Sequence, residues 1–266
     1  MPPAPRRPAG RGLPLDRRRT LLAATEPARA AVSAGALAVS LPLLAVAPRG
    51  ERHPVLVLPG LMASDTSTRV LRRWLRGLGY PVVGWALGRN RGPTQEVVDE
   101  LPELVRRLAD EHGTAVSIVG QSLGGIFARR LAQRSHDSIR SVVTLGSPFG
   151  MAHRGPDETP AARLYSRLSP QHSTGKISTS RIRLSKPLPV PSTSVYSRWD
   201  GVVDWRACLQ QEGPRSENIA VHASHLGMGF DPAVLWILAD RLAQTRDGWE
   251  PFRRPARLGA LFPEPG

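Results

Sequence analysis

The chain has 266 residues, of which 41% are hydrophobic, and is long enough to bury the core of one large α/β domain or of two small ones. Its formal net charge is +14, but the basic residues are mostly arginines spread thinly along the chain. They form no basic stripe with interleaved aromatic residues, so we expect no specific nucleic-acid partner. Cys208 is the single cysteine, which excludes an intramolecular disulfide and predicts a small, buried apolar side chain.

The N-terminal part divides into two segments. Residues 1–20 carry several arginines among prolines and glycines, a composition that predicts a disordered basic arm. Residues 21–47 are rich in alanine and leucine and admit three interpretations: an apolar helix packed on the domain or lying on a membrane surface, a membrane anchor, or an export signal. Glu26 and Arg29 interrupt the apolar run near its start, so we favour the helix. The expected protein is then cytoplasmic or membrane-associated, and export by an N-terminal signal stays open.

Between residues 48 and 246, apolar strands alternate with amphipathic helices, which predicts an α/β domain with a parallel sheet wound by right-handed crossovers. Residues 151–191 interrupt this alternation and are too many for a passive loop. Residues 247–266 are again rich in proline and arginine, and we expect a disordered tail. Strand patterns occupy 54–62, 81–87, 115–119, 141–145, 191–197 and 218–222, and helical patterns follow Thr68, Thr94, Ser122 and Asp231.

The most informative stretch is residues 115–125, where a β-branched apolar run breaks at Gly120, presents Ser122 and continues into a helical pattern. Gly120 and Gly124 leave room for a sharp strand-to-helix turn that exposes the serine hydroxyl at the carboxyl edge of the sheet. In this context the sequence Gly-Gln-Ser-Leu-Gly resembles the nucleophile elbow of the α/β-hydrolase superfamily, within it the bacterial lipase- and esterase-like members. The resemblance extends over roughly residues 53 to 245.

The resemblance implies the α/β-hydrolase fold, with a mostly parallel central sheet and helices on both of its faces. In this family an insertion after the strand at 141–145 often forms a cap over the active site. We therefore expect residues 151–191 to be a small cap, with a flexible surface loop as the alternative.

A Ser-His-Asp triad in that chain order is also implied by the resemblance, with Ser122 as the nucleophile. The acid is expected just past a strand and before a glycine, where Asp200 stands; Asp204 is the less favoured alternative. Two histidines follow the acid. His222 continues the strand pattern and is expected to be half-buried, whereas His225 lies in a glycine-containing loop from which its imidazole can reach the serine, so we favour His225 as the base.

The oxyanion hole of such enzymes is made of backbone N–H groups. Leu123, directly after the nucleophile, is the first expected donor. The second comes from the loop after the strand at 54–62, where Leu61 and Met62 are equally suitable and Pro59 replaces the histidine common in lipases. A tight turn without a catalytic part is the alternative for this loop.

These residues predict a serine hydrolase that cleaves small-molecule or lipid carboxylic esters through an acyl-enzyme on Ser122. The mechanism needs no cofactor and no metal, and the sequence has no HExxH pattern or His and Cys cluster that would bind one. An acyltransferase or amidase on the same triad is one alternative. A non-catalytic, membrane-associated binding protein is the other, because residues 1–47 can contact a membrane surface.

Overall fold

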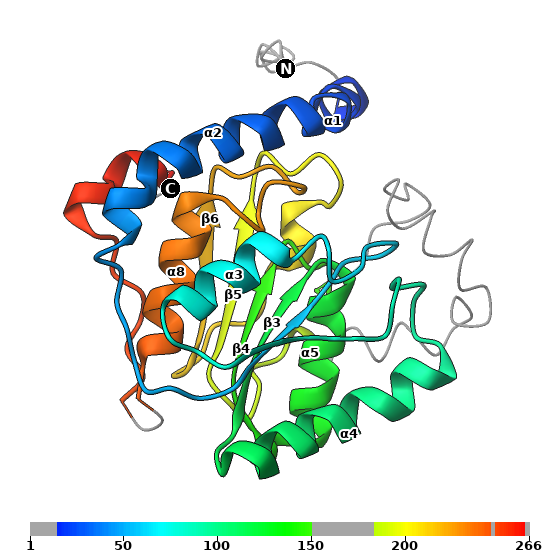
Figure 1. Cartoon of the computed structure of the whole chain (residues 1–266). Helices are drawn as coiled ribbons and strands as arrows, with labels where there is room; N and C mark the ends of the chain where they lie inside the picture. The colour runs from blue at the N-terminus through cyan, green and yellow to red at the C-terminus, as the bar shows by residue number, and fades with distance from the viewer. Residues whose placement is uncertain (1–14, 151–183, 246–247, 264–266) are drawn as a thin grey trace, which may run out of the picture.

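The computed structural model of the chain describes residues 15–150, 184–245 and 248–263 (Figure 1). Helices cover both faces of one central sheet, as the alternating sequence pattern predicts. In chain order the elements are α1 (Leu15–Ala24), α2 (Glu26–Leu44), β1 (Val55–Leu58), α3 (Arg69–Gly77), β2 (Val82–Gly84), α4 (Gln95–His112), β3 (Val116–Gln121), α5 (Leu123–Arg134), η1 (His136–Ser138), β4 (Ile139–Leu145), β5 (Ser192–Ser197), η3 (Trp205–Cys208), β6 (Ser216–Val221), α8 (Pro232–Ala243) and η4 (Ala256–Leu261).

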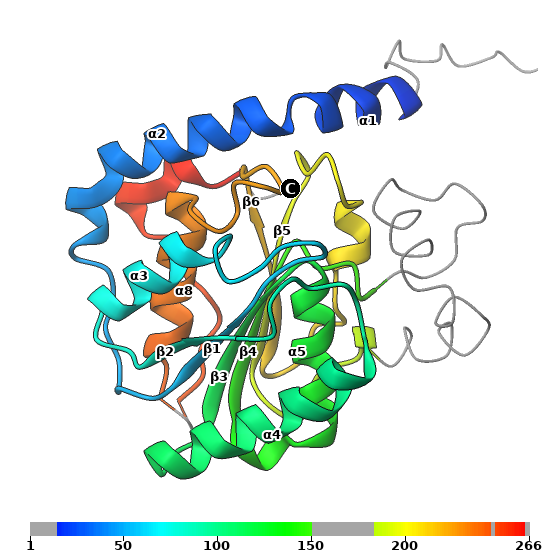
Figure 2. The ribbon, with the colours of Figure 1, turned by 45° about the vertical axis from the view of Figure 1, so that its right-hand side comes forward.

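The six strands lie in the order β2-β1-β3-β4-β5-β6, and every neighbouring pair is parallel. Figure 2 shows the twisted sheet with α4 and α5 on one side and α3 and α8 on the other. Parallel strands place all of their carboxyl ends at one edge, so the loops after β1, β3, β4, β5 and β6 meet there. This edge is where the predicted site residues of the chain converge.

The pleat of the sheet divides the apolar side chains between two cores. Along β1, Val55 and Val57 face the core shared with α3 and α8, whereas Leu56 and Leu58 face the core shared with α4 and α5. All four side chains are fully buried, because a parallel strand covered on both faces has no solvent side. The unbroken apolar runs that predict the strands are the consequence of this double burial.

Helices α1 and α2 lie across the carboxyl edge, above β5 and β6 (Figures 1 and 2). Helix α2 packs on α8: Leu44 is 3% exposed in the core, and the Ser33 hydroxyl donates to the Asp231 carboxylate at 3.1 Å. Residues 15–20, expected to belong to a disordered arm, instead form the first turns of α1. A long-range ion pair between Arg19 and Asp204 (2.7 Å) ties that helix to the domain.

By length and composition α2 could cross a membrane, although such a helix can equally be a signal sequence or the core helix of a soluble protein. Its outer side chains are largely exposed here, while its inner side chains contact the domain. The helix packed on the domain is therefore the arrangement that this structure contains.

The C-terminal segment also differs from expectation. Described residues 248–263, expected to be a disordered tail, return to the core and include η4. Phe262 is 4% exposed and contacts the Phe252 ring at a centroid distance of 5.5 Å. Apolar aromatic side chains that cover α8 thus order a segment whose proline and arginine content suggested disorder.

The predicted cap at 151–191 lies mostly outside the described residues. Its described end, from Leu184, returns along the α5 side of the sheet, where Leu188 and Val190 are buried. The Arg129 guanidinium of α5 donates to the carbonyl oxygens of Leu184 (2.6 Å) and Lys186 (2.7 Å). Burial alone lowers the pKa of Arg129 to about 9, so the group keeps its charge at neutral pH.

Cys208 is buried, as expected.

If α2 is part of the folded domain, its inner and outer side chains must differ in their contribution to stability. We predict that Leu44→Ala lowers the free energy of unfolding by about 2–5 kcal/mol, because it leaves a cavity in the core. Val39→Ala on the same helix, at a side chain that is 81% exposed, should change it by less than about 0.5 kcal/mol. Urea unfolding of both variants tests this; equal effects would mean that α2 does not pack on the domain in solution.

Candidate active site

Ser122 occupies a strained turn between β3 and α5. Its backbone dihedrals are φ 51° and ψ −118°, which a residue with a side chain rarely adopts. An added Cβ would lie 2.5 Å from the Gly124 carbonyl carbon if placed on Gly120, and 2.4 Å from the Leu58 carbonyl oxygen if placed on Gly124. A Cβ added to Gly125 would lie 2.0 Å from the Ser147 hydroxyl oxygen. The turn therefore needs glycine because backbones of three segments meet around it.

Asp200 follows β5 and is held in a fixed orientation. One carboxylate oxygen accepts hydrogen bonds from the backbone N–H groups of Val202 (2.8 Å) and Val203 (2.7 Å). The other accepts from Nδ1 of His225 at 2.6 Å. The alternative acid, Asp204, is the N-cap of η3 and pairs with Arg19, so it is engaged away from the histidine.

His225 is buried in the loop between β6 and α8. Its carbonyl oxygen accepts a hydrogen bond from the side-chain amide of Gln121 (3.2 Å), the residue that precedes Ser122. This contact joins the histidine loop to the turn at Ser122. His222 was expected to be a half-buried strand residue, but it lies just past the end of β6 and is exposed, because the strand stops at Val221.

The electrostatic surroundings favour the charged form of His225. Burial by itself lowers the pKa of the imidazole, but the charge of Asp200, the hydrogen bond to Asp200 and the charge of Glu26 together outweigh it and raise the pKa. With Nδ1 donating to Asp200, the neutral ring carries its free acceptor at Nε2. Such a ring can take a proton at Nε2 and hold it while the carboxylate stabilises the resulting charge.

The serine and the Asp200–His225 pair share the carboxyl edge of neighbouring strands. A Cβ on Gly146, just past β4, would lie 3.2 Å from both Asp200 Oδ2 and His225 Nδ1, and the Ser122 N–H donates to the carbonyl of Leu145 (2.8 Å). The hydrogen bonds among the described residues do not include one between Ser122 and His225. Such contacts are often long in ligand-free enzymes and tighten when substrate binds.

One expected backbone donor, Leu123, adjoins the serine, and the loop that holds the other two candidates begins close to it. Leu123 is the first residue of α5, so its N–H has no partner within the helix. On the other side, Gly60 approaches the Ser122 side chain so closely that a Cβ there would lie 3.2 Å from the serine Cβ. Met62 instead donates its N–H to the carbonyl of Asn90 at 2.7 Å, which leaves Leu61 as the better of the two alternatives in this loop.

Asn90 is a site-supporting residue that the sequence pattern does not reveal. It is fully buried, and its side-chain amide donates to the carbonyl oxygen of Pro59 (2.8 Å). Its backbone N–H donates to Ala63 (2.8 Å) in addition to the bond that it accepts from Met62. These bonds fasten the loop after β1 at both ends. Glycines and arginines surround Asn90 in the sequence and carry no signal of this role.

A Ser–His contact lies near the opposite, amino-terminal edge of the sheet. His53 Nε2 is 2.8 Å from the Ser117 hydroxyl, and its Nδ1 is 2.9 Å from the backbone carbonyl of Glu51. Burial first, and then the charge of Arg140, lower the pKa of His53 to about 4. Because a backbone carbonyl rather than a carboxylate orients this ring, and because both His53 and Ser117 are buried, the contact is structural. In the described ranges no group of three or more His, Cys, Asp or Glu side chains could hold a metal ion.

Comparison with known proteins identifies the fold. No family model matches the chain. Among solved structures, Aspergillus fumigatus lipase B has a TM-score of 0.57 at 15% identity, and the match covers 74% of this chain and 54% of that chain. The monoacylglycerol lipase of Paleococcus ferrophilus has a TM-score of 0.52 at 15% identity, covering 73% and 96%. The thioesterase domain from the curacin biosynthetic pathway has a TM-score of 0.51 at 14% identity, covering 72% and 93%.

The chain thus spans about half the length of the lipase B chain and nearly all of the other two. With its parallel six-stranded sheet, it has the α/β-hydrolase fold, which confirms the expectation from the elbow sequence.

The close packing around Ser122 leads to a test of the turn. We predict that Gly124→Ala lowers the free energy of unfolding by about 1–3 kcal/mol, since the added methyl group meets the backbone of β1. Gly35→Ala in α2, where nothing lies within 4 Å of the new Cβ, should raise it by about 0.5–1 kcal/mol. Chemical denaturation measures both; a Gly124→Ala variant as stable as the parent would contradict the described turn.

Proposed function

We propose that this protein is a serine hydrolase of carboxylic esters that uses Ser122 as nucleophile, His225 as general base and Asp200 as the acid that orients the base. The observation that carries the proposal is the 2.6 Å hydrogen bond between the buried Asp200 and His225, at the strand edge where the Ser122 turn also lies. A serine on a strained turn, an imidazole that can accept a proton at Nε2 and a carboxylate behind it together form the apparatus of acyl transfer.

In the proposed reaction, His225 Nε2 takes the hydroxyl proton while Ser122 Oγ attacks the ester carbonyl carbon. The resulting oxyanion accepts hydrogen bonds from the N–H groups of Leu123 and Leu61, each worth about 3 kcal/mol of barrier. The C–O bond to the alcohol then breaks, and His225 returns the proton to the leaving oxygen. Water, deprotonated by the same imidazole, releases the acid and regenerates Ser122.

The structural neighbours support esters as the substrate class, since lipases and other lipolytic enzymes recur among them together with a thioesterase domain. Hydrolysis of an ester or thioester proceeds at an acyl carbonyl, which the groups proposed here can attack. Because the triad determines the acyl-enzyme but not the acceptor, an alcohol or amine in place of water would give an acyltransferase or amidase. Product analysis with an ester and a competing alcohol distinguishes them.

The nucleophile is tested by Ser122→Ala. We expect this variant to fold but to have no activity on p-nitrophenyl esters above background, and to resist covalent labelling by a fluorophosphonate probe, because the acyl-enzyme oxygen is missing. Ser67→Ala, an exposed serine in the loop before α3, serves as the matched control and should keep both properties. Labelling of Ser122→Ala at another serine would refute the proposal.

The acid is tested by comparing two aspartates four residues apart. Asp200→Asn should lower kcat by about 10⁴-fold, as loss of a triad acid does, whereas Asp204→Asn should leave it nearly unchanged. In the parent enzyme, kcat/KM should rise with pH through a midpoint above the ordinary histidine pKa of about 6.5, because the base acts in its neutral form and its pKa is raised. The reverse ranking of the two variants would assign the acid to Asp204.

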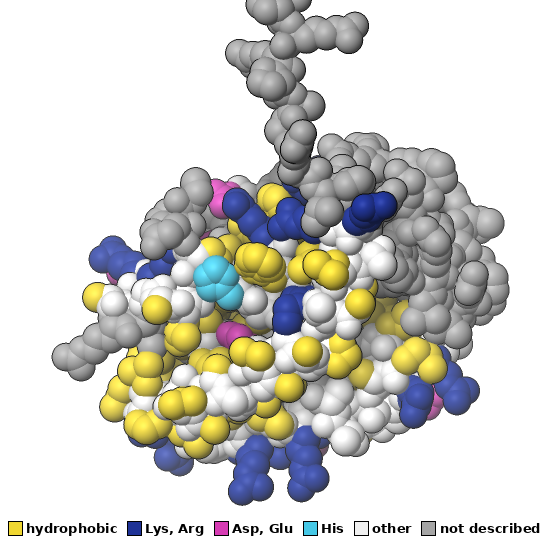
Figure 3. All heavy atoms as spheres, turned by 90° about the horizontal axis from the view of Figure 1, so that it is seen from above, with side chains coloured by type: hydrophobic (Ala, Val, Ile, Leu, Met, Phe, Trp, Pro, Cys, Tyr) yellow, Lys and Arg dark blue, Asp and Glu magenta, His cyan; other side chains and the backbone are white. Residues whose placement is uncertain are grey.

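We also propose that α1 and α2 contact an anionic membrane surface while remaining packed on the domain. Figure 3 shows this face from above, with apolar side chains among basic ones. The exposed apolar side chains include Val32 (71%), Val39 (81%) and Val46 (72%) of this N-terminal region, and the chain as a whole is strongly basic. A face of this kind binds where acyl chains and negative headgroups are both available.

Vesicle sedimentation tests the membrane contact. The protein should bind phosphatidylglycerol vesicles more strongly than phosphatidylcholine vesicles, and added salt should weaken the binding. A double variant, Val32→Gln with Val39→Gln, should bind several-fold more weakly. Val98→Gln on α4, at an exposed valine of a different helix, should not. Equal loss in both variants, or no binding by the parent, would contradict the proposal.

A further inference from the structure

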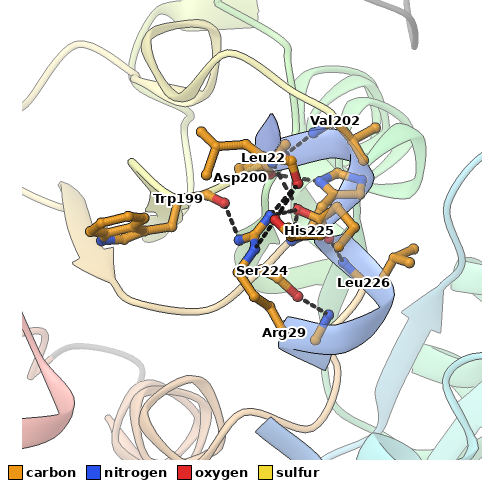
Figure 4. A network of polar contacts seen from close by, with 12 residues as sticks. Leu22, Arg29, Trp199, Asp200, Val202, Ser224, His225 and Leu226 are labelled. Atoms are coloured by element: carbon orange, nitrogen blue, oxygen red, sulfur yellow. Dashed lines mark hydrogen bonds and ion pairs between the residues drawn. The ribbon is translucent and has the colours of Figure 1, made fainter. Parts of the chain in front are cut away.

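A single buried carboxylate joins the two loops that carry Asp200 and His225. Glu26, in the first turn of α2, is 2% exposed. It accepts hydrogen bonds from the backbone N–H groups of Gly201 (2.8 Å), His225 (3.1 Å) and Leu226 (3.0 Å). One bond thus comes from Gly201, which follows Asp200, and the other two come from His225 and the residue after it. Figure 4 shows this network between the helix and the two loops.

Arg29, in the next turn of the same helix, adds further contacts to this network. We refer to the Glu26–Arg29 pair as the clamp. Its guanidinium lies 2.9 Å from the Glu26 carboxylate, donates to the carbonyl of Leu22 at 2.6 Å, and donates to the carbonyl of Trp199. Trp199 and Gly201 are the residues on either side of Asp200. The Glu26–Arg29 pair therefore holds the backbone before and after the acid, and Glu26 also holds the backbone of the base.

The two loops need such a link because the sheet does not hold them. The paired register of β5 and β6 ends at Ser197 and Val221, before either loop begins. Beyond that point the 2.6 Å contact between Asp200 and His225 depends on how the loops are held. Helix α2 is anchored independently through Ser33 and Asp231, and a Cβ on Gly227 would lie 3.0 Å from the Ser33 hydroxyl, so the helix also packs against the histidine loop.

The charge of Glu26 is maintained in its buried position. Burial by itself raises the pKa of its carboxyl group, but the three N–H donors and Arg29 outweigh this and lower the pKa. The group is therefore ionised at neutral pH, at the N-terminus of a helix whose dipole favours a negative charge. It is not part of the predicted triad, it faces backbone rather than a substrate position, and the proposed chemistry does not use it.

We propose that Glu26 is a positioning residue, which with Arg29 sets the spacing and orientation of Asp200 and His225 and so makes α2 an integral part of the active-site edge. This inference rests on the proposed function for its catalytic consequence, but not for the geometry it describes. Displacement of a catalytic group by about 1 Å can cost about 10²-fold in rate, so a clamp at this point controls kcat rather than substrate affinity.

The test uses the full-length protein with Glu26→Gln and Glu26→Ala. With a soluble p-nitrophenyl ester, kcat and the rate of fluorophosphonate labelling should fall by about 10- to 100-fold in Glu26→Ala, and less in Glu26→Gln, which keeps one acceptor oxygen. KM should stay nearly constant. The matched control is Glu103→Gln, which removes an exposed carboxylate with the same i,i+3 relation to an arginine, Arg106, on α4.

The pH profile separates positioning from a merely structural role. The charged groups that act on His225 are Asp200 and Glu26, with Arg29 opposing Glu26 on α2; Asp231 on α8 is engaged by Ser33 and by the N–H of Ala233. Both carboxylates raise the pKa of His225. Glu26→Gln should therefore shift the acid limb of kcat/KM to lower pH, and the imidazole NMR titration of His225 should move by the same amount. Glu103→Gln should shift neither.

Amide hydrogen exchange tests the contacts of Glu26 without any measurement of catalysis. Loss of the carboxylate should accelerate exchange at Gly201, His225 and Leu226, and Glu26→Gln, which preserves shape, keeps the test valid if Glu26→Ala fails to fold. If Glu26→Gln keeps the kcat, the acid limb of kcat/KM and the amide exchange rates of the parent protein, the inference is wrong. The parent protein could show no esterase activity and no fluorophosphonate labelling while Glu26→Gln still changes the amide exchange and the His225 titration as expected. In that case the proposed function is wrong, and the positioning role of Glu26 stands.

Discussion

The backbone turn at Ser122 is the constraint on which the rest of the carboxyl edge depends. Its positive φ places the serine above the sheet, and the approach of Gly120 and Gly124 to neighbouring backbone leaves no space for a side chain at either position. Strain of this kind, of order 1–3 kcal/mol, persists only where the surrounding structure enforces it. Here β1, β4 and the first turn of α5 enforce it, so the loops after those strands are brought within reach of the serine.

Buried charges at this edge are each matched by fixed hydrogen bonds. Asp200 has two backbone donors in addition to His225, and Glu26 has three backbone donors in addition to Arg29. Such groups would cost several kcal/mol if left unpaired in the interior. Because their partners are mainly backbone N–H groups of the loops, satisfying the charges also determines the shape of the loops. The same hydrogen bonds therefore stabilise the buried charges and hold the loops in position.

The N-terminal helices link this geometry to the surface. Their inner side contributes Glu26 and Leu44 to the domain, while their outer side exposes valines near arginines. A membrane that contacted the outer face would lie directly above the loops of Asp200 and His225. In the combined proposals, the same helices that set the spacing of the catalytic groups also present the edge to a lipid ester.

The sequence alone determined the periodic features. Apolar runs of strand length alternating with helical patterns predicted the parallel α/β sheet, since a strand that is buried on both faces consists almost entirely of apolar residues. Gly120, Ser122 and Gly124 identified the elbow, because a turn that tight requires glycine at fixed positions. The family resemblance placed the expected acid at Asp200, with Asp204 as the alternative, and chain order narrowed the expected base to His222 or His225. The structure joins the side chains of Asp200 and His225 by a hydrogen bond.

Only the tertiary structure decided which segments meet. Local sequence could not reveal that the β6 strand stops before His222, nor that the backbone N–H of Met62 is engaged by the carbonyl of Asn90. Glu26 looked like an interruption in an apolar helix, yet it is the carboxylate shared by two loops about 175 and 199 residues further along the chain. Such contacts depend on where distant loops converge, and a one-dimensional pattern of polarity carries no information about that convergence.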